Sequence, residues 1–365
     1  MLFLSLALIL YQGQTVSTGD VFANASRALQ SKDYAQAEAG FREVLRREPG
    51  NLEAMGNLGV LYSRRNLPAK AVETYLRALR LVPDEPGLLL NLGLAYMKLD
   101  AYAKARPLFA TLSQRNSPRQ QQALELLGIC QLQSGDTAGA IATLEPLLAG
   151  PKPSPGVYHF LALAYVKQQR QAHAQQVLDQ LLVRLPAAQA NYLEGRVWYD
   201  AAIFDRAQSS FEKAAAADPR LPGLALEQGK TQLSLRNYEE AAKLLRLALE
   251  QDPDDLEARY FLGALLVQEG KNEEAAPLLI AVKEARPDLW GTSYYLGKAQ
   301  LAIGNAAAAL PLLKTAASRA PNEAPVQYQL ARALQALGRK AEAQLVFARV
   351  SRLQSKANSE SILMK

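Results

Sequence analysis

Residues 57–84 read NLGVLYSRRNLPAKAVETYLRALRLVPD, and residues 260–288 follow the same plan as YFLGALLVQEGKNEEAAPLLIAVKEARPD. In both stretches a glycine lies near the start and a proline lies near the end. The glycine recurs every 34 residues at two sets of positions, Gly59 and Gly93, then Gly195, Gly229, Gly263 and Gly297. The proline keeps the same interval at Pro49 and Pro83, then Pro219, Pro253, Pro287 and Pro321. This period predicts a solenoid of stacked helical hairpins, not a globule with a single core.

Alignment on these glycines and prolines divides most of the chain into ten units. The units span residues 18–51, 52–85, 86–119, 121–154, 155–187, 188–221, 222–255, 256–289, 290–323 and 324–357, and residues 358–365 form a C-terminal tail. Within each unit the apolar residues recur at three- and four-residue spacing, which predicts two amphipathic helices. The closing proline cannot continue the second helix and therefore marks its end.

Small residues recur where paired helices must approach closely. In the second unit, Gly59 lies midway along the first helix, Ala71 lies near the start of the second, and Tyr75 fills the wider gap. On this pattern, residues 18–357 resemble the tetratricopeptide repeat (TPR) family. The resemblance implies an all-α, right-handed superhelical solenoid of about ten helical hairpins, with a concave groove lined by the first helices. It also implies a role in recognising partner proteins.

The segment 150–156, GPKPSPG, interrupts the array between the fourth and fifth units. Three prolines and two glycines in seven residues cannot form a helix. Pro146 also lies deep enough in the preceding helix to kink it. Two interpretations stay open: a longer loop between repeats, or a hinge between units one to four and units five to ten.

The N-terminus differs from the repeats. Residues 2–11, LFLSLALILY, form an apolar run that is too short to span a bilayer. Small and polar residues follow it, so residues 1–17 fit a signal peptide, although no Lys or Arg precedes the run. The sequence therefore predicts export to the periplasm or the outside, with no stable membrane span after signal removal. The alternatives are a first helix packed on the solenoid of a cytoplasmic protein, or membrane association through an uncleaved N-terminus.

Composition argues against several kinds of chemistry. The net charge of +6 comes from 41 basic and 35 acidic residues without a basic block, which argues against nucleic acid as a partner. Cys130 is the only cysteine, and His159 and His173 are the only histidines, so cysteine clusters and histidine-rich zinc sites cannot form. The chain has no G-x-S-x-G, phosphate loop, dinucleotide fingerprint or H-E-x-x-H motif. We expect a non-catalytic protein with no metal and no cofactor.

The candidate binding residues lie on the first helices of the later units. Two sites on each of these helices point about 140° away from the buried stripe, and the resemblance implies that they face the groove. The first site holds Tyr192, Tyr260, Tyr294 and Tyr328. The second site, four residues later, holds Arg196, Lys230, Lys298 and Arg332. Stacked repeats would turn them into an aromatic ladder and a basic ladder, suited to a peptide rich in Asp or Glu or to a free carboxylate. The alternative is that the tyrosines pack on neighbouring helices and that Glu227, Glu257 and Asp200 dilute the positive charge.

The earlier units are lined differently. Asn57 and Asn91 each stand in an Asn-Leu-Gly triplet and are expected to face the groove. An amide offers both a donor and an acceptor to an extended peptide backbone. The pair resembles the start of the asparagine ladder in the TPR arrays of O-linked N-acetylglucosamine transferases, but Leu126 follows in place of a third rung. The carboxylate clamp of TPR co-chaperones is not matched.

Taken together, the sequence predicts a non-catalytic scaffold or adaptor that binds partner proteins or extended acidic peptides in its concave groove. Two alternatives stay open. One is a homo-oligomeric assembly element that associates through its C-terminal repeat, where Val346, Phe347 and Val350 have no further repeat to cover them. The other is a regulatory or substrate-presenting subunit of an enzyme complex.

Overall fold

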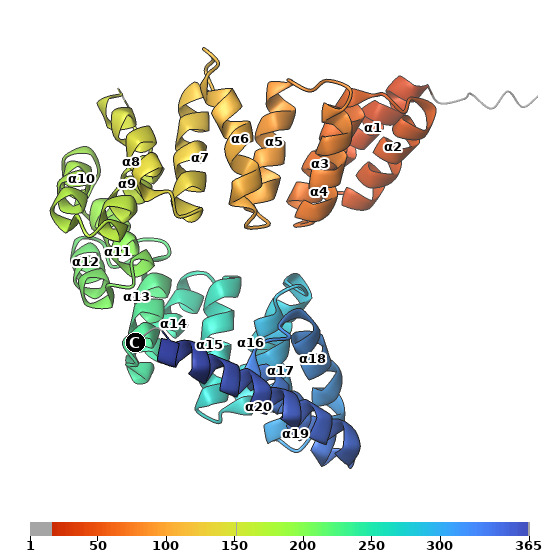
Figure 1. The fold of residues 1–365 in the computed structure, drawn as a ribbon, viewed down its shortest axis with the longest axis vertical. Coiled ribbons are helices and arrows are strands. Elements are labelled where there is room, and N and C mark those ends of the chain that lie inside the picture. Colours follow the sequence, from red (N-terminus) through yellow and green to blue (C-terminus); the bar gives the residue numbers. More distant parts are fainter. Residues whose placement is uncertain (1–16, 151, 364–365) are drawn as a thin grey trace, which may run out of the picture. The chain divides into compact units, whose positions relative to one another are not determined.

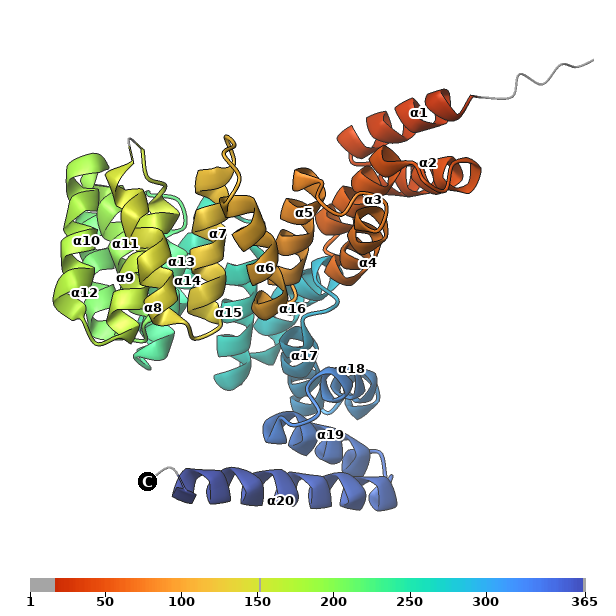
Figure 2. The same cartoon turned by 45° about the horizontal axis from the view of Figure 1, so that its top comes forward.

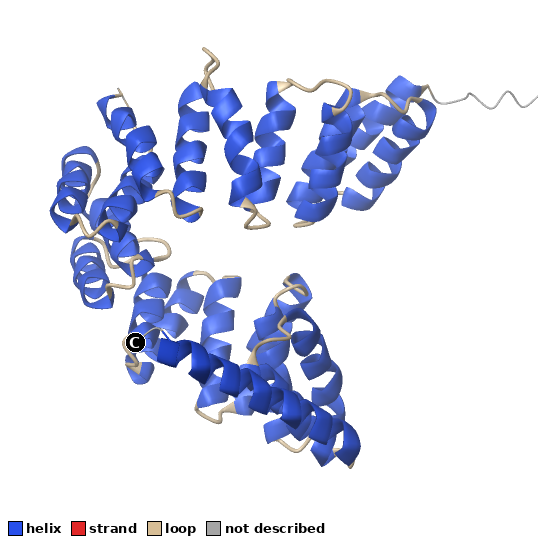
Figure 3. Ribbon diagram, in the orientation of Figure 1, coloured by secondary structure: helices blue, strands red, loops and turns tan. Residues whose placement is uncertain are grey.

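The computed structural model describes residues 17–150 and 152–363, with side chains as far as Lys356. Over these residues the chain forms twenty α-helices and one short 3-10 helix, with no strand (Figures 1 and 3). The predicted all-α fold of about ten helical hairpins is confirmed. The predicted signal peptide, residues 1–17, falls almost wholly outside the described residues.

The chain divides into two compact units, residues 1–179 and 180–365, with the division inside helix α10. The helices that begin in the first unit are α1 (Thr18–Gln30), α2 (Tyr34–Arg47), α3 (Leu52–Arg64), α4 (Pro68–Leu79), α5 (Pro86–Met97), α6 (Tyr102–Ser113), α7 (Gln120–Gln133), α8 (Thr137–Leu144), the 3-10 helix η1 (Glu145–Ala149), α9 (Pro155–Lys167) and α10 (Gln171–Arg184). The helices of the second unit are α11 (Ala187–Asp200), α12 (Phe204–Ala217), α13 (Leu224–Ser234), α14 (Tyr238–Gln251), α15 (Leu256–Gln268), α16 (Asn272–Ala285), α17 (Trp290–Ala302), α18 (Ala306–Arg319), α19 (Ala324–Ala336) and α20 (Lys340–Leu363).

Odd-numbered helices are the first helices of the hairpins and even-numbered helices are the second. In the first unit α1, α3 and α5 contact one another in succession, and so do α11, α13, α15, α17 and α19 in the second unit. A second helix such as α4 packs on both α3 and α5, so that each hairpin buries its apolar face against the next. The first helices that contact one another in this way therefore share one face.

The recurring glycine lets the two helices of its hairpin approach each other closely. A β-carbon added at Gly93 of α5 would lie 2.5 Å from Cζ of Phe109, which is fully buried on α6. At Gly195 it would lie 2.5 Å from Cε1 of Phe211, and at Gly229 it would lie 2.9 Å from Cγ of a leucine. The glycine is thus required by the large side chain that the second helix inserts against it.

The predicted break at 150–156 coincides with a change of helix type. Helix α8 ends at Leu144, and Pro146 stands near the start of η1. Side-chain hydrogen bonds nevertheless join the fourth and fifth hairpins: Ser154 Oγ donates to Glu125 Oε1 at 2.8 Å, and Tyr165 OH donates to Glu145 Oε1 at 2.6 Å. The compact units divide at 179/180, so a hinge at 150–156 stays a prediction.

Limited proteolysis tests the hinge. Lys152 is exposed and lies outside any helix, so we expect subtilisin at low concentration to cut first near this residue. A stable fragment that begins near residue 153 and contains the later hairpins should accumulate, as seen by intact-mass analysis. A first cut inside α10, near the division between the compact units, would contradict the hinge at 150–156.

The lone cysteine is a core residue. Cys130 lies on α7 and is fully buried, and burial raises the pKa of its thiol to about 11. Because the thiolate is the reactive form, this environment makes the group inert near neutral pH.

The C-terminal helix is longer than the sequence predicts. Helix α20 runs without a break from Lys340 to Leu363 and continues well past its partner α19 (Figure 2). The residues expected to form a separate tail therefore extend the last helix as far as Leu363. Val350 is buried, and Val346 and Phe347 are half-buried against the core of the last hairpins, whereas Leu345 keeps 72% of its surface exposed.

Candidate partner-binding surface

The two asparagines predicted from the first unit lie in one hollow. Asn57 on α3 and Asn91 on α5 are half-buried and both line an open hollow of about 450 Å³. Glu53 and Glu85 contribute carboxylates to the same hollow. The contact between α3 and α5 thus brings the two amides together, in reach of one extended segment.

Tyr192 and Tyr260 pack between hairpins of the second unit. The ring of Tyr192 lies 6.0 Å from that of Phe211, and its hydroxyl stands beside Gly223, where an added β-carbon would approach it to 3.2 Å. The hydroxyl of Tyr260 stands beside Gly291 in the same way. Burial raises the pKa of Tyr192 above its ordinary value and the pKa of Tyr260 to about 12. Packing on neighbouring helices, the alternative considered from the sequence, describes these two tyrosines.

The tyrosines of the last two hairpins differ in exposure: burial raises the pKa of Tyr294 as it does that of Tyr192, whereas Tyr328 is exposed. The Tyr294 ring on α17 is half-buried, with its centroid 6.5 Å from that of Trp290 and 5.0 Å from that of Tyr295. Tyr328 on α19 is 44% exposed, with one edge against Phe347. Trp290 is 36% exposed. Aromatic surface is therefore presented on both α17 and α19.

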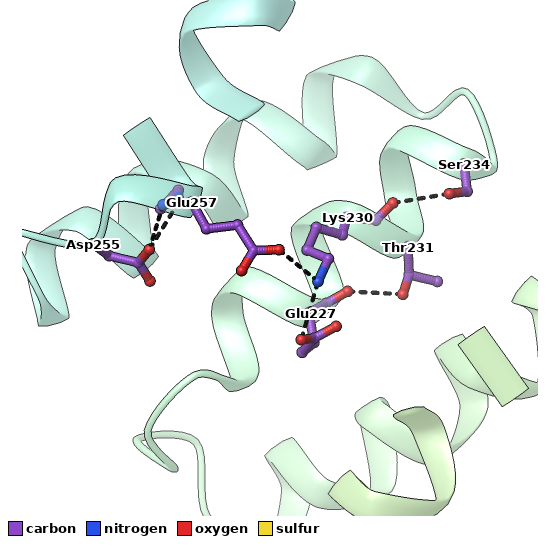
Figure 4. A network of polar contacts seen from close by, with 7 residues as sticks. Glu227, Lys230, Thr231, Ser234, Asp255 and Glu257 are labelled. Atoms are coloured by element: carbon purple, nitrogen blue, oxygen red, sulfur yellow. Dashed lines mark hydrogen bonds and ion pairs between the residues drawn. The ribbon is translucent and has the colours of Figure 1, made fainter. Parts of the chain in front are cut away.

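Lys230 is held by an internal ion-pair cluster. Its Nζ lies 3.1 Å from Glu227 Oε1 on its own helix and 2.9 Å from Glu257 Oε1 on α15, and Figure 4 shows the amine between the two carboxylates. The Lys230 and Glu227 side chains are only 13% and 10% exposed. The amine also lies 5.3 Å from the ring centroid of Tyr199 on α11 and 5.9 Å from that of Phe261. This cluster joins the first helices of three successive hairpins.

The charges around Lys230 stabilise its cationic form. Burial alone would lower the pKa of Lys230, but the hydrogen bond that its amine donates to Glu257 and the negative charges of Glu227 and Glu257 outweigh burial and raise it. Because the two carboxylates balance this amine from within the protein, Lys230 offers little net positive charge to a ligand.

The other three predicted cations are not balanced in this way. Arg196 and Arg332 are exposed, Lys298 is half-buried, and none of the three forms an ion pair within residues 17–150 and 152–356. Lys298 follows Tyr294 by one helical turn on α17, and Arg332 follows Tyr328 by one turn on α19. Since α17 and α19 contact each other, these four residues lie on neighbouring helices and define what we call the α17–α19 surface.

Two contributing residues were missed from the sequence. Phe261 and Tyr295 directly follow two of the predicted tyrosines, and they are separated by the same 34-residue interval. The centroids of Tyr260 and Tyr295 lie 6.0 Å apart, so these rings connect two hairpins. Alignment of the position that follows the tyrosine in each repeat could have found them.

The described part of the chain holds neither a membrane-spanning helix nor a cluster of metal-binding side chains. None of its helices is long and apolar enough to cross a membrane. In the same residues, no group of three or more His, Cys, Asp and Glu side chains is placed to hold a metal ion.

Family comparison agrees with the hairpin architecture. Two family models described as tetratricopeptide repeat match the chain, one over residues 22–86 and 90–155 and the other over residues 225–301 and 300–360. This chain belongs to the tetratricopeptide repeat family. Proteins of this family are generally non-catalytic scaffolds that bind other proteins.

Individual relatives are similar over parts of their length. The photosystem I assembly protein Ycf3 of Synechococcus sp. (strain CC9605) is 35% identical over 69 residues, 18% of this chain and 40% of that protein. The protein CTR9 homolog of Arabidopsis thaliana is 28% identical over 249 residues, 64% of this chain and 22% of that protein. The chain thus spans less than half the length of these curated relatives.

Solved structures of repeat proteins are also similar. Yeast Tom70 is 15% identical with a TM-score of 0.46, covering 92% of each chain. MamA from Desulfovibrio magneticus RS-1 is 20% identical with a TM-score of 0.43, covering 47% of this chain and 96% of its own.

Proposed function

We propose that this protein is a non-catalytic scaffold that binds an extended acidic segment of a partner protein on the face formed by its first helices. The observation that carries the proposal is the contrast between equivalent positions of the repeat. Lys230 is balanced by Glu227 and Glu257, whereas Lys298 and Arg332 form no ion pair within the described side chains. Unbalanced cations next to exposed aromatic rings are suited to carboxylate ligands.

The α17–α19 surface would contact a ligand through two kinds of side chain, cations and tyrosines. Lys298 and Arg332 would each donate hydrogen bonds to a carboxylate, and an arginine can hold it with two parallel hydrogen bonds. Tyr294 and Tyr328 would supply rigid contact area with a hydroxyl at the tip. The two helices each carry one such pair, so two acidic residues of an extended segment would bind in register with two hairpins.

A peptide-binding experiment tests this assignment. The probe is a fluorescein-labelled 12-residue peptide rich in Glu and Tyr, followed by fluorescence anisotropy. The variant K298Q/R332Q should bind it at least about tenfold more weakly than the original chain, because two charge-assisted contacts are lost. The control K314Q/R319Q removes the same charge from exposed positions on α18 and should change the affinity less than about twofold. Equal losses in the two variants would contradict a specific site.

Self-association is a second candidate, favoured by the exposed Leu345 on the long final helix. Light scattering over a range of concentrations tests it. A mass that rises with concentration in the original chain and stays monomeric in L345E would support an interface on α20. A strict monomer would exclude it.

We also propose that the chain is exported after removal of the apolar N-terminal segment. The apolar run at residues 2–11 and the small and polar residues after it support this. Intact-mass analysis of protein from its native host should detect a chain that lacks about the first 17 residues. A chain that still begins at Met1 and is recovered from the cytosol would contradict export.

A further inference from the structure

The first compact unit carries a basic hollow on its second helices, away from the Asn57 and Asn91 positions. It has a volume of about 480 Å³ and lies between α2 and α4, with α3 beneath. Five cations line it: Arg42 and Arg46 from α2, and Lys70, Arg77 and Arg80 from α4 and its C-terminal end. We call it the outer hollow.

The floor of the outer hollow is apolar. Leu45 of α2 and Met55 and Leu58 of α3 line it, and all three are largely buried in the core of the first hairpins. The hollow therefore combines charged walls with an aliphatic base.

Two of the five cations are engaged by carboxylates. Arg42 Nη2 lies 2.8 Å from Glu38 Oε1, and Arg46 Nε lies 2.7 Å from Glu43 Oε2. Both pairs are on α2 itself and are at least partly exposed. Exposed pairs of this kind contribute little and can exchange partners at small cost.

The three cations of α4 have weaker internal contacts. Arg77 Nη2 donates to the Pro49 carbonyl at 3.1 Å, and Lys70 Nζ lies 5.6 Å from the ring centroid of Tyr62. None of Lys70, Arg77 and Arg80 forms an ion pair among the side chains that the structure describes, and Glu73 is the one carboxylate in the lining.

The outer hollow carries a net positive charge. The lining residues and the carboxylates ion-paired with them carry five cations against three carboxylates, a net charge of +2. The cations are Arg42, Arg46, Lys70, Arg77 and Arg80, and the carboxylates are Glu38, Glu43 and Glu73. A concave site of one sign attracts ligands of the opposite sign.

We propose that the outer hollow binds an acidic segment of a partner protein, with an apolar side chain of that segment on Leu45, Met55 and Leu58. The acidic residues would pair with Lys70, Arg77 and Arg80. A protein segment fits better than a nucleic acid, because a phosphate backbone needs the cations but leaves an aliphatic floor without a partner. This site lies on second helices of the first unit and does not rest on the α17–α19 surface.

The test isolates the outer hollow by working in a K298Q/R332Q background, where the proposed α17–α19 surface is disabled. The probe is a fluorescein-labelled 15-residue peptide in which pairs of Glu flank single Leu residues. The added variant K70Q/R80Q should weaken binding at least about tenfold, since it removes two cations that have no ion-pair partner among the described side chains. The control R27Q/K32Q removes the same charge from exposed positions on α1 and the turn after it, and should change binding less than about twofold.

Three further arms decide between ligand classes. Replacement of Leu by Ser in the peptide should weaken binding about fivefold or more if the apolar floor is used. Single-stranded RNA and phosphatidylserine vesicles should bind more weakly than the peptide. Tighter binding of either one, equal losses in the two double variants, or a peptide Kd above about 1 mM for the K298Q/R332Q background would overturn the proposal. Circular dichroism of every variant checks that the helices are intact.

Discussion

Gly93→Ala is expected to lower the free energy of unfolding of the first compact unit by about 1–3 kcal/mol. The added β-carbon would lie 2.5 Å from Cζ and 2.6 Å from Cε1 of Phe109. The Phe109 ring is fully buried between α5 and α6, so it cannot turn away without disturbing other core residues. The higher helix propensity of alanine would offset only part of this cost.

Gly56→Ala is the matched control. Gly56 lies on α3, inside a helix like Gly93, but its added β-carbon would meet only Cδ2 of Leu88, at 3.9 Å. We therefore expect it to raise stability by about 0.5–1 kcal/mol, through reduced backbone entropy in the unfolded chain. Urea unfolding followed by circular dichroism compares the two variants. A similar effect of both substitutions would show that close packing does not explain why glycine recurs at this position of the repeat.

The hairpin register follows from the sequence because it depends on local rules. In the predicted unit 86–119, helix α5 starts at Pro86, and α6 ends at Ser113, six residues before the predicted boundary. Small residues at the close contact and proline after the second helix fix this register in most units. The same rules place the candidate binding residues on one face of their own helices, because helical periodicity fixes direction.

The surroundings of those residues could not be predicted, since they come from other hairpins. The spacing predicts that Lys230 faces the same way as Lys298, and both lie on first helices. It does not reveal that the Glu257 carboxylate reaches Lys230 from the next hairpin, or that Tyr260 covers Gly291. These contacts depend on the rotation between adjacent hairpins, and the sequence of a single repeat does not determine that rotation.

The outer hollow was missed for a related reason. Its cations come from α2 and α4, which are separated along the chain by the whole of α3. Along the sequence they are dispersed among the glutamates of the same helices, so no basic block appears. Only the packing of second helices in successive hairpins collects them around one floor.

Lys230→Met is expected to destabilise the second compact unit by about 3–5 kcal/mol, the usual cost when one partner of a buried ion pair is removed. The Glu227 side chain is only 10% exposed and would be left in the interior without its cation. Lys298→Met is the matched control, because it occupies the same position of the repeat and forms no ion pair within the described residues. Its effect on stability should stay within about 0.5 kcal/mol.

The stability that Lys230 contributes should depend on pH. The pKa of Lys230 is raised above its ordinary value of 10.5 in the folded protein, so the stability that its charge contributes is present below that value. It is lost only as pH rises through the folded pKa. The stability difference between the original chain and K230M should therefore be constant from about pH 7 to pH 10 and shrink at higher pH.

A second substitution separates the buried charge from simple loss of packing. In K230M/E227Q the unpaired carboxylate becomes a neutral amide, so part of the lost stability should return. Lys298→Met should instead weaken binding of the Glu- and Tyr-rich peptide while leaving urea unfolding unchanged. If K298M proved as destabilising as K230M, or if K230M/E227Q recovered no stability, the division between a structural and a ligand-binding lysine at one repeat position would be wrong.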